Sequence, residues 1–387
     1  MVIQIDGGAR TNKGGQLMLV AVLQEIKKRF PNAEVIENDI RPNEKLLKQQ
    51  FGPNGRLSGS DTLRRIVATL GMEKYAFLFM KKFWHRYSIY RAKKGIDLVL
   101  DVGGFQFGDQ WNHTQYNIRM WKNYLSGLKR NGTKVIFLPQ AFGPFEKKGS
   151  KAMLEVLNRY ADLLIARDDK SYSYLISAGT DERHVALFPD FTNSVKGIET
   201  ESTAMSKGKV CIIPNNKIFK KDVMEEDDYM RTIVDIVRHV NEKGHEAVLL
   251  NHEGEKDFKL CQKIASMAEG IPIITGLNAV ETKGVVADSY LVISSRYHGI
   301  ANALSSGVPC LATSWSHKYK KLLDEFGQGD CLIDLGNKED CLAKVDSLLE
   351  ASGNQSMRAS LTEKHAQVIA KNEEMWDFVW DYVLRKE

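Results

Sequence analysis

Short apolar runs alternate along this chain with longer segments of amphipathic, helical periodicity. The first half carries the apolar runs VIQIDGG, DLVLDVGG, KVIFLPQ, DLLIARD and HVALFPD, with helical patterns over residues 15–29, 112–130, 150–160 and 169–178. Continuous apolar runs of this length are typical of strands buried on both faces of a parallel sheet. The alternation therefore predicts βα units that build a mostly parallel sheet.

The same rhythm restarts after residue 209. Apolar runs KVCIIPN, EAVLLNHE, IPIITG, SYLVISSR, PCLATSW and CLIDLG precede or separate helical patterns over residues 227–243, 255–268, 278–287, 298–306, 317–326 and 338–350. The pattern predicts an α/β protein with two Rossmann-like, doubly wound domains that face a cleft lined by the loops at the strand carboxyl ends.

A polar segment, KGIETESTAMSKGK, separates the two series and is the best linker in the chain. We therefore predict an N-terminal domain over residues 1–195, a linker over 196–208 and a C-terminal domain over 209–356. The last segment, 357–387, is helical in pattern and carries several aromatic residues. We expect it to cross back and pack on the first domain.

The composition argues against several classes of protein. The formal net charge of the 387 residues is only +5, which is far from the strongly basic balance of a dedicated nucleic-acid binder. The five cysteines are odd in number and include no CxxC pair, so neither a disulfide framework nor a zinc site is expected. The beginning of the sequence does not resemble a signal peptide, and no run of 18 apolar residues is present. We expect a cytoplasmic protein.

Residues 72–94, MEKYAFLFMKKFWHRYSIYRAKK, combine many aromatic side chains with an excess of basic ones. A packed helix with a solvated basic side explains this pattern. An interfacial helix that docks on anionic lipid at the inner face of the membrane explains it too, and would bring the protein to a lipid-linked substrate.

The most constrained motif is the turn in ISSRYHGIANALSSG, where a strand pattern ends and a helical pattern begins. Backbone N–H groups at a helix start attract anions, and Arg296 adds a fork that matches a carboxylate or phosphate. His298 can donate to the same anion or move a proton at neutral pH. Gly299 leaves space for a ligand. The alternative is that Arg296 pairs with a structural carboxylate and His298 caps the helix.

The segment ARDDKSYSYL repeats this design in the first half, with Arg167 at a strand end and Asp168 or Asp169 as the N-cap of the next helix. If the domains face each other, Arg167 and Arg296 approach from opposite walls and suit a ligand with two anionic groups. A salt bridge between Arg167 and a neighbouring aspartate is the alternative.

Glycine-rich turns follow two other strands. In DVGGFQFGDQWN, Gly103 and Gly104 allow close approach of a ligand, and Asp109 is placed as a base or a hydroxyl-orienting group. In DGGARTNKGG, Asn12 is a further candidate for substrate binding. Neither turn is a Walker A or dinucleotide fingerprint, so we expect no nucleotide cofactor.

Weaker candidates lie at other strand ends and helix starts, and no catalytic triad or paired metal-ligand motif is visible. They are Gln140 in LPQAFGPF, Asp190 in FPDFTN, Lys217, Lys220 and Lys221 in IPNNKIFKK, His252 and Glu253 in LLNHEGE, and Lys318 in SHKYKKLL.

Taken in order, GGFQFGDQW, VIFLPQAFGPF, ARDDKSYSYL, FPDF and SSRYHGIANALSSGVPCLA resemble the polysaccharide pyruvyl transferase family over most of residues 3–335. The resemblance implies a two-domain fold similar to GT-B glycosyltransferases. It also implies an enzyme that transfers the enolpyruvyl unit of phosphoenolpyruvate to two hydroxyls of a sugar in a polysaccharide or lipid-linked glycan. The product is a ketal, phosphate is released, and no cofactor or metal is required.

Carried over to this sequence, the resemblance assigns Arg296 and His298 to phosphoenolpyruvate, with His298 as the acid that protonates its methylene carbon. Arg167 matches a family arginine, and Asp109 matches the family's Gly-Asp position, where it could accept a hydroxyl proton.

The sequence departs from the family pattern at Phe105 and Gln106, where glycine and asparagine are frequent, and near Asn216–Lys217, where arginine is common. These departures concern the acceptor more than the donor. Two other functions stay open: a GT-B-type glycosyltransferase that uses a nucleotide sugar, and an inactive carbohydrate-binding relative.

Overall fold

A computed structural model describes residues 1–8, 12–38, 55–57, 95–219, 224–313 and 317–385. The chain forms two compact units. Unit 1 comprises Met1–Thr192 and Lys371–Glu387, and unit 2 comprises Asn193–Ala370. The aromatic and basic segment 72–94 lies outside the described residues.

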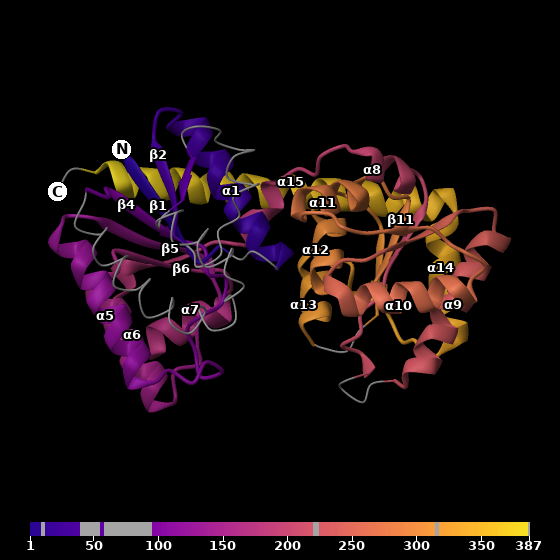
Figure 1. Ribbon diagram of the computed structural model, residues 1–387, viewed down its shortest axis with the longest axis horizontal. Coiled ribbons are helices and arrows are strands. Elements are labelled where there is room, and N and C mark those ends of the chain that lie inside the picture. Colours follow the sequence, from indigo (N-terminus) through magenta and orange to yellow (C-terminus); the bar gives the residue numbers. More distant parts are fainter. Residues whose placement is uncertain (9–11, 39–54, 58–94, 220–223, 314–316, 386–387) are drawn as a thin grey trace, which may run out of the picture. The chain divides into compact units, whose positions relative to one another are not determined.

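Unit 1 is built on a parallel sheet. Within the described residues it has seven strands in the order β3-β2-β1-β4-β5-β6-β7 (Figure 1). The strands are β1 (Val2–Asp6), β2 (Glu34–Asn38), β3 (Gly55–Leu57), β4 (Leu98–Asp101), β5 (Lys134–Gln140), β6 (Leu163–Ala166) and β7 (Val185–Leu187). The helices described between them are α1 (Lys13–Arg29), α5 (Gln115–Arg130), α6 (Lys148–Tyr160) and α7 (Asp169–Ser177).

Unit 2 repeats the architecture with a second parallel sheet, whose described strands follow the order β10-β9-β8-β11-β12-β13. They are β8 (Val210–Ile213), β9 (Ala247–Leu250), β10 (Ile273–Ile274), β11 (Leu291–Ser294), β12 (Cys310–Thr313) and β13 (Leu332–Ile333). The helices are α8 (Glu201–Ser206), α9 (Glu226–Glu242), α10 (Gly254–Met267), α11 (Ala279–Ala287), α12 (Tyr297–Leu304), α13 (His317–Glu325) and α14 (Lys338–Leu349).

Each sheet has a point where the winding direction reverses. In unit 1 the neighbours β1 and β4 are far apart in sequence, and Asp6 pairs with Asp101 at their ends. In unit 2 the corresponding neighbours are β8 and β11, where Ile213 pairs with Ser294. Ligands of open α/β sheets bind beyond the strand carboxyl ends at such switch points, so the loops after these four strands are where a site is expected.

Most of the described strands are buried along their length, as the continuous apolar runs predict. Residues of β4, β6, β8, β9, β11 and β12 are all buried, and the fold class predicted from the sequence is confirmed. The sequence did not indicate β2 and β3. Within the polar segment predicted as a linker, residues 201–206 form α8, which packs against α11.

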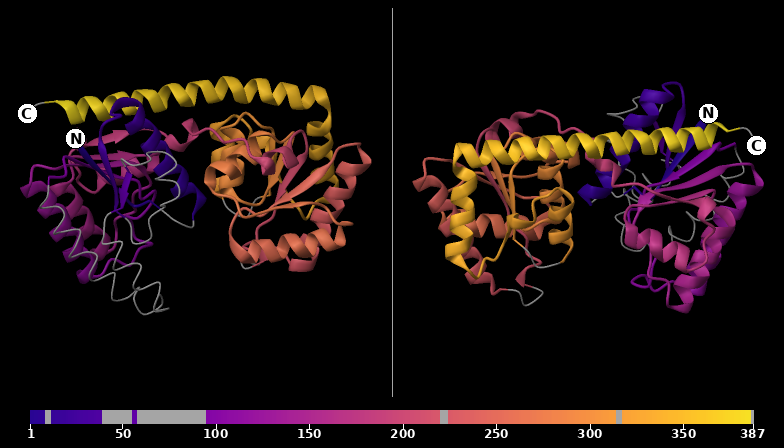
Figure 2. Two further views of the ribbon diagram at one scale, coloured as in Figure 1. Left: turned by 45° about the horizontal axis from the view of Figure 1, so that its top comes forward. Right: turned by 180° about the vertical axis from the view of Figure 1, so that it is seen from behind.

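Helix α15 (Ala351–Leu384) is one continuous helix (Figure 2). From Lys371 onward it belongs to unit 1, where Trp376 and Trp380 are buried. The Trp380 ring lies 4.9 Å from that of Phe30, and its Nε1 donates to Glu25 Oε1 at 3.1 Å. The predicted packing of the C-terminal helix on the first domain is therefore confirmed.

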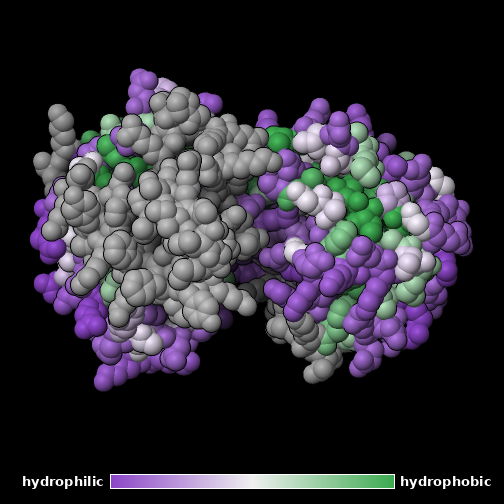
Figure 3. All heavy atoms as spheres, viewed as in Figure 1, coloured by the Kyte–Doolittle hydropathy of each residue, from purple (hydrophilic) through white to green (hydrophobic). Residues whose placement is uncertain are grey.

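The surface is mixed in polarity. On the face of unit 2 seen in Figure 3, hydrophilic side chains cover much of the surface and apolar ones gather in one region. None of the helices that the structure describes has the length and apolarity needed to cross a membrane. All five cysteines are buried and free, and they lie in the apolar core of unit 2.

Candidate functional site

Arg296 lies two residues after the end of β11, at the switch point of unit 2, and its guanidinium is held by two carboxylates. Nε donates to Asp257 Oδ2 at 2.7 Å, Nη2 donates to the same oxygen, and Nη1 donates to Glu253 Oε2. The Arg296 side chain is only 8% exposed. Its two partners differ, because Asp257 is fully buried whereas 38% of the Glu253 side chain is exposed.

Asp257 holds the Arg296 guanidinium in place from the buried side. Its second oxygen, Oδ1, accepts from the backbone N–H of Asn216 at 3.2 Å and from the Asn216 side chain. Burial raises the pKa of Asp257, and the charge of Arg296 opposes that shift. With both oxygens engaged, Asp257 fixes the orientation of the guanidinium. Sequence reasoning missed Asp257, because it stands out only as one of two acidic residues in the first turn of α10.

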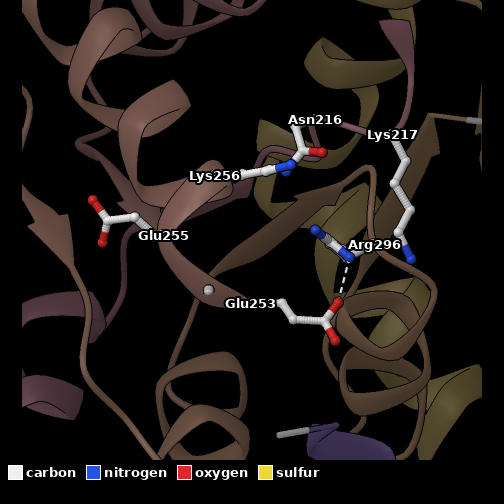
Figure 4. A pocket seen from close by; sticks show the side chains of 7 residues that line it. Asn216, Lys217, Glu253, Glu255, Lys256 and Arg296 are labelled. Carbon is white, nitrogen blue, oxygen red and sulfur yellow. Dashed lines mark hydrogen bonds and ion pairs between the residues drawn. The ribbon is translucent and has the colours of Figure 1, made fainter. Parts of the chain in front are cut away.

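A pocket of about 580 Å³ opens above Arg296, within unit 2. It is lined by Asn216, Lys217, Glu253, Gly254, Glu255, Lys256 and Arg296. These residues come from the loops after β8, β9 and β11 and from the start of α10. In Figure 4 the side chains of Arg296 and Glu253 point toward each other, whereas Glu255 points away from them.

Two helices begin at this pocket, and neither start is capped by its own side chain. Arg296 is the N-cap residue of α12, and Glu253 is that of α10. Unsatisfied N–H groups and the partial positive charge of a helix start favour an anion. Lys217, Lys256 and Arg296 add three positive side chains to these helix starts, and Glu253 and Glu255 add two negative ones.

His298 lies in the first turn of α12 and is half-buried. Its ring is nearly parallel to that of His252, with centroids 6.5 Å apart. His298 is not among the residues that line the pocket, although it follows Arg296 by two positions. At Gly299, a Cβ would lie 2.4 Å from Ser294 Oγ, so this glycine lets α12 pack closely on β11. The structure thus gives Gly299 a packing role where the sequence suggested space for a ligand.

At the switch point of unit 1, the end of β4 carries a buried carboxylate that the sequence analysis did not single out. Asp101 Oδ1 accepts from the backbone N–H of Gly103 at 3.0 Å and from Gln140 Nε2 at 3.0 Å. Gln106 Nε2 donates to both oxygens of Asp101, at 2.8 and 2.9 Å. Burial raises the pKa of Asp101 to about 6, against these hydrogen bonds. Gln140, predicted as a site residue, belongs to this cluster.

Arg167 lies at the end of β6, next to the end of β5. Its backbone N–H donates to Gln140 O at 3.1 Å, and its half-buried side chain stands 3.9 Å from Asp190 Oδ2. Of the two aspartates predicted as the N-cap of the following helix, Asp168 is the N-cap, and its side chain accepts from Ser171 N at 2.8 Å. Arg167 belongs to unit 1 and Arg296 to unit 2, and their joint use by one ligand stays a prediction.

Asp109 is fully engaged in holding a helix. It accepts from the backbone N–H groups of Glu146 and Lys147, each at 3.0 Å, and from Ser150 Oγ. Desolvation acts to raise the pKa of Asp109, but these bonds outweigh it and lower the pKa overall. A carboxylate with a lowered pKa is a weak base, and the contacts identify Asp109 as a cap for α6.

Of the other predicted site residues, Asn12 and Gly104 have roles in the local backbone structure, and the side chain of Lys318 lies outside the described part of the chain. Asn12 caps α1 by accepting from Gly14 N at 2.9 Å. Gly104 adopts a positive φ of 69°, which suits glycine. Lys318 is the second residue of α13, and its side chain lies outside the described part. Among the described residues, no group of three His, Cys, Asp or Glu side chains could hold a metal ion.

The two units, each built on a parallel α/β sheet, give the protein a GT-B-like fold. Solved structures share it. The UDP-GlcNAc 2-epimerase from Neisseria meningitidis is 11% identical with a TM-score of 0.63, covering 100% of both chains. HepE from Anabaena, in complex with UDP, is 12% identical with a TM-score of 0.59, covering 98% of this chain and 99% of its own. At these identities the likeness concerns the fold alone.

The sequence profile of the polysaccharide pyruvyl transferases matches residues 12–317. The chain therefore belongs to the polysaccharide pyruvyl transferase family. Membership implies a transferase whose acceptor is a sugar or polysaccharide. The matched range includes the loop after β4 in unit 1 and the loops after β8 and β11 in unit 2, and it ends at the first residue of α13.

Proposed function

We propose that this protein transfers the enolpyruvyl unit of phosphoenolpyruvate to two hydroxyls of a sugar, forming a ketal and releasing phosphate. The observation that carries the proposal is the pocket above Arg296, in a chain that belongs to this family. A small ligand with a carboxylate and a phosphate matches a pocket with three cationic side chains and two helix starts. The proposed donor side is the C-terminal domain, and the acceptor side is the N-terminal domain.

When the donor binds, one of its anionic groups replaces the Glu253 carboxylate as a partner of Arg296. Asp257 keeps the Nε and Nη2 side of Arg296, whereas Glu253 on the Nη1 side is partly exposed. An anionic group of phosphoenolpyruvate takes the place of the Glu253 carboxylate on Nη1, and Lys217 and Lys256 neutralise the remaining charge. Lys318, and Arg167 from unit 1, are further candidates for donor contacts.

The reaction begins with proton transfer to carbon. Protonated His298 gives its proton to the methylene carbon, which becomes a methyl group, and C2 becomes electron-poor. The first sugar hydroxyl bonds to C2, and its proton returns to His298. The second hydroxyl then bonds to C2, the C2–O bond to phosphate breaks, and the phosphate leaves with the second proton. The balance needs no oxidant, cofactor or metal.

His298 keeps the role of acid that the sequence suggested, but the acceptor of the hydroxyl proton is no longer Asp109. Asp109 is a positioned cap for α6, so the proposal leaves hydroxyl-proton transfer to His298 and the departing phosphate. Gln140, Gly103 and Gly104 remain on the acceptor side, at the end of β4 and β5, and Asn12 remains there as the start of α1.

Calorimetric titration tests the proposal against its main alternative. The protein is titrated with phosphoenolpyruvate, UDP-glucose and UDP-GlcNAc, since similar solved structures hold UDP or UDP-GlcNAc. We expect binding of phosphoenolpyruvate. At a concentration of 100 times its Kd, it should stabilise the fold by about 2.7 kcal/mol. Binding of the UDP-sugars without phosphoenolpyruvate would overturn the proposal in favour of a glycosyltransferase.

A further inference from the structure

Two exposed aromatic rings lie side by side on the loop that follows β4 in unit 1. Phe105 and Trp111 are each 43% exposed, and their ring centroids are 5.3 Å apart at an angle of 54°. Two exposed aromatic rings in contact with each other leave a shared apolar area in water, which a ligand with an apolar face can cover. The pair is therefore a candidate contact surface.

The loop holds these rings in place. Trp111 Nε1 donates to Phe105 O at 2.9 Å, and Phe105 N donates to Gly103 O at 2.7 Å. Phe107, between the two rings in sequence, is fully buried and anchors the loop in the core of unit 1. A surface whose backbone is fixed in this way loses little conformational freedom when it binds a ligand.

Hydrogen-bonding groups flank the aromatic pair. Gly104 O accepts from Ala141 N at 2.9 Å, which places the loop beside the end of β5. Gln106, adjacent to Phe105, and Gln140 both contact Asp101. Gln140 is fully buried, and its Oε1 accepts no hydrogen bond in the part of the chain that the structure describes. The switch point of unit 1 thus holds a buried acceptor atom for which the described residues supply no donor.

We infer that Phe105 and Trp111 form a stacking surface for a sugar ring of the acceptor glycan. A pyranose has an apolar C–H face that packs on aromatic rings and a rim of hydroxyls that needs hydrogen-bond partners. The loop after β4 supplies the aromatic rings and Gln106, and the end of β5 supplies Gln140. Both lie at the place where open α/β sheets bind ligands. The inference rests on the proposed function, because the family implies a sugar or polysaccharide acceptor.

Saturation-transfer difference NMR tests this surface without any turnover. The probes are methyl glycosides of glucose, galactose, mannose and N-acetylglucosamine, added to the full chain. We expect at least one glycoside to receive saturation on its C–H protons. Phe105→Ala and Trp111→Ala should each weaken that signal, corresponding to roughly a tenfold loss of affinity.

Phe378→Ala is the matched control, because Phe378 is an exposed aromatic of unit 1 on α15 instead of the loop. It should leave the signal unchanged, and thermal unfolding should show that all three variants are folded. Equal signals in all variants, or no signal for any glycoside, would overturn the inference. Calorimetry with phosphoenolpyruvate reports separately on the proposed function: loop variants that keep donor binding but lose the glycoside signal support both.

Discussion

The two carboxylate partners of Arg296 differ in burial. Asp257 is fully buried and accepts from Arg296 and Asn216, so removing it would leave a buried guanidinium without its anchor. Glu253 is more than a third exposed and contacts only the pocket side of the guanidinium. Under the proposed function, this difference allows an arginine that is already paired to bind an anionic ligand as well.

Glu253→Gln should therefore tighten phosphoenolpyruvate binding. The amide no longer competes as a charge for Nη1 of Arg296, and a partly exposed ion pair of this kind is worth up to about 1 kcal/mol, or roughly fivefold in Kd. Glu255→Gln is the matched control, since Glu255 lines the same pocket and points away from Arg296 (Figure 4). Calorimetry should give a lower Kd for the first variant than for the second. Equal values would show that only the net charge of the pocket matters.

The sequence identified Arg296 but not the group that holds it. Arg296 could be recognised because it stands where an apolar strand ends and a small-residue helix begins. Asp257 lies inside the first turn of α10, where acidic residues are common for reasons of helix electrostatics alone. Asp101 was hidden for a similar reason, because an aspartate before two glycines resembles an ordinary turn.

At the scale of helices and strands, the sequence predicts most elements of both units. The apolar runs predict the buried strands because parallel strands are covered on both faces. Strand β2 escaped notice because EVIEN is short and half polar, although Glu37 within it is fully buried. Strand β3 has only three residues. The loops between elements, which carry the side chains of both sites, take their conformation from tertiary contacts that no local pattern reveals.

Asp109 illustrates an element whose stability depends on a distant residue. Asp109→Ala should lower the free energy of unfolding by about 1 to 2 kcal/mol, because two backbone N–H groups at the start of α6 lose their acceptor. Urea unfolding measures this loss, and Asp109→Asn, which keeps one acceptor oxygen, should lose less. The turnover number should stay within about twofold of the unchanged protein. A large fall in turnover with unchanged stability would return Asp109 to the role of a catalytic base.

At the scale of the whole molecule, the chain places one switch-point site in each of two similar units. Unit 2 carries the pocket lined by Arg296, Lys217 and Lys256, and unit 1 carries the aromatic pair beside a cluster of amides around Asp101. The chemistry of the two sites is complementary, because a doubly anionic donor needs charge and a sugar acceptor needs apolar and hydrogen-bonding surface. This division of labour is the basis of the proposed reaction.

The most direct test of the account is a mass balance of the reaction itself. The protein is incubated with phosphoenolpyruvate and a pool of glycan acceptors, and released phosphate is compared with pyruvate bound to glycan by mass spectrometry. We expect equal amounts of phosphate and of an acid-labile pyruvate ketal, with turnover reduced by roughly 10²- to 10⁴-fold in His298→Gln. Phosphate release without modified glycan, or undiminished turnover in that variant, would contradict the account.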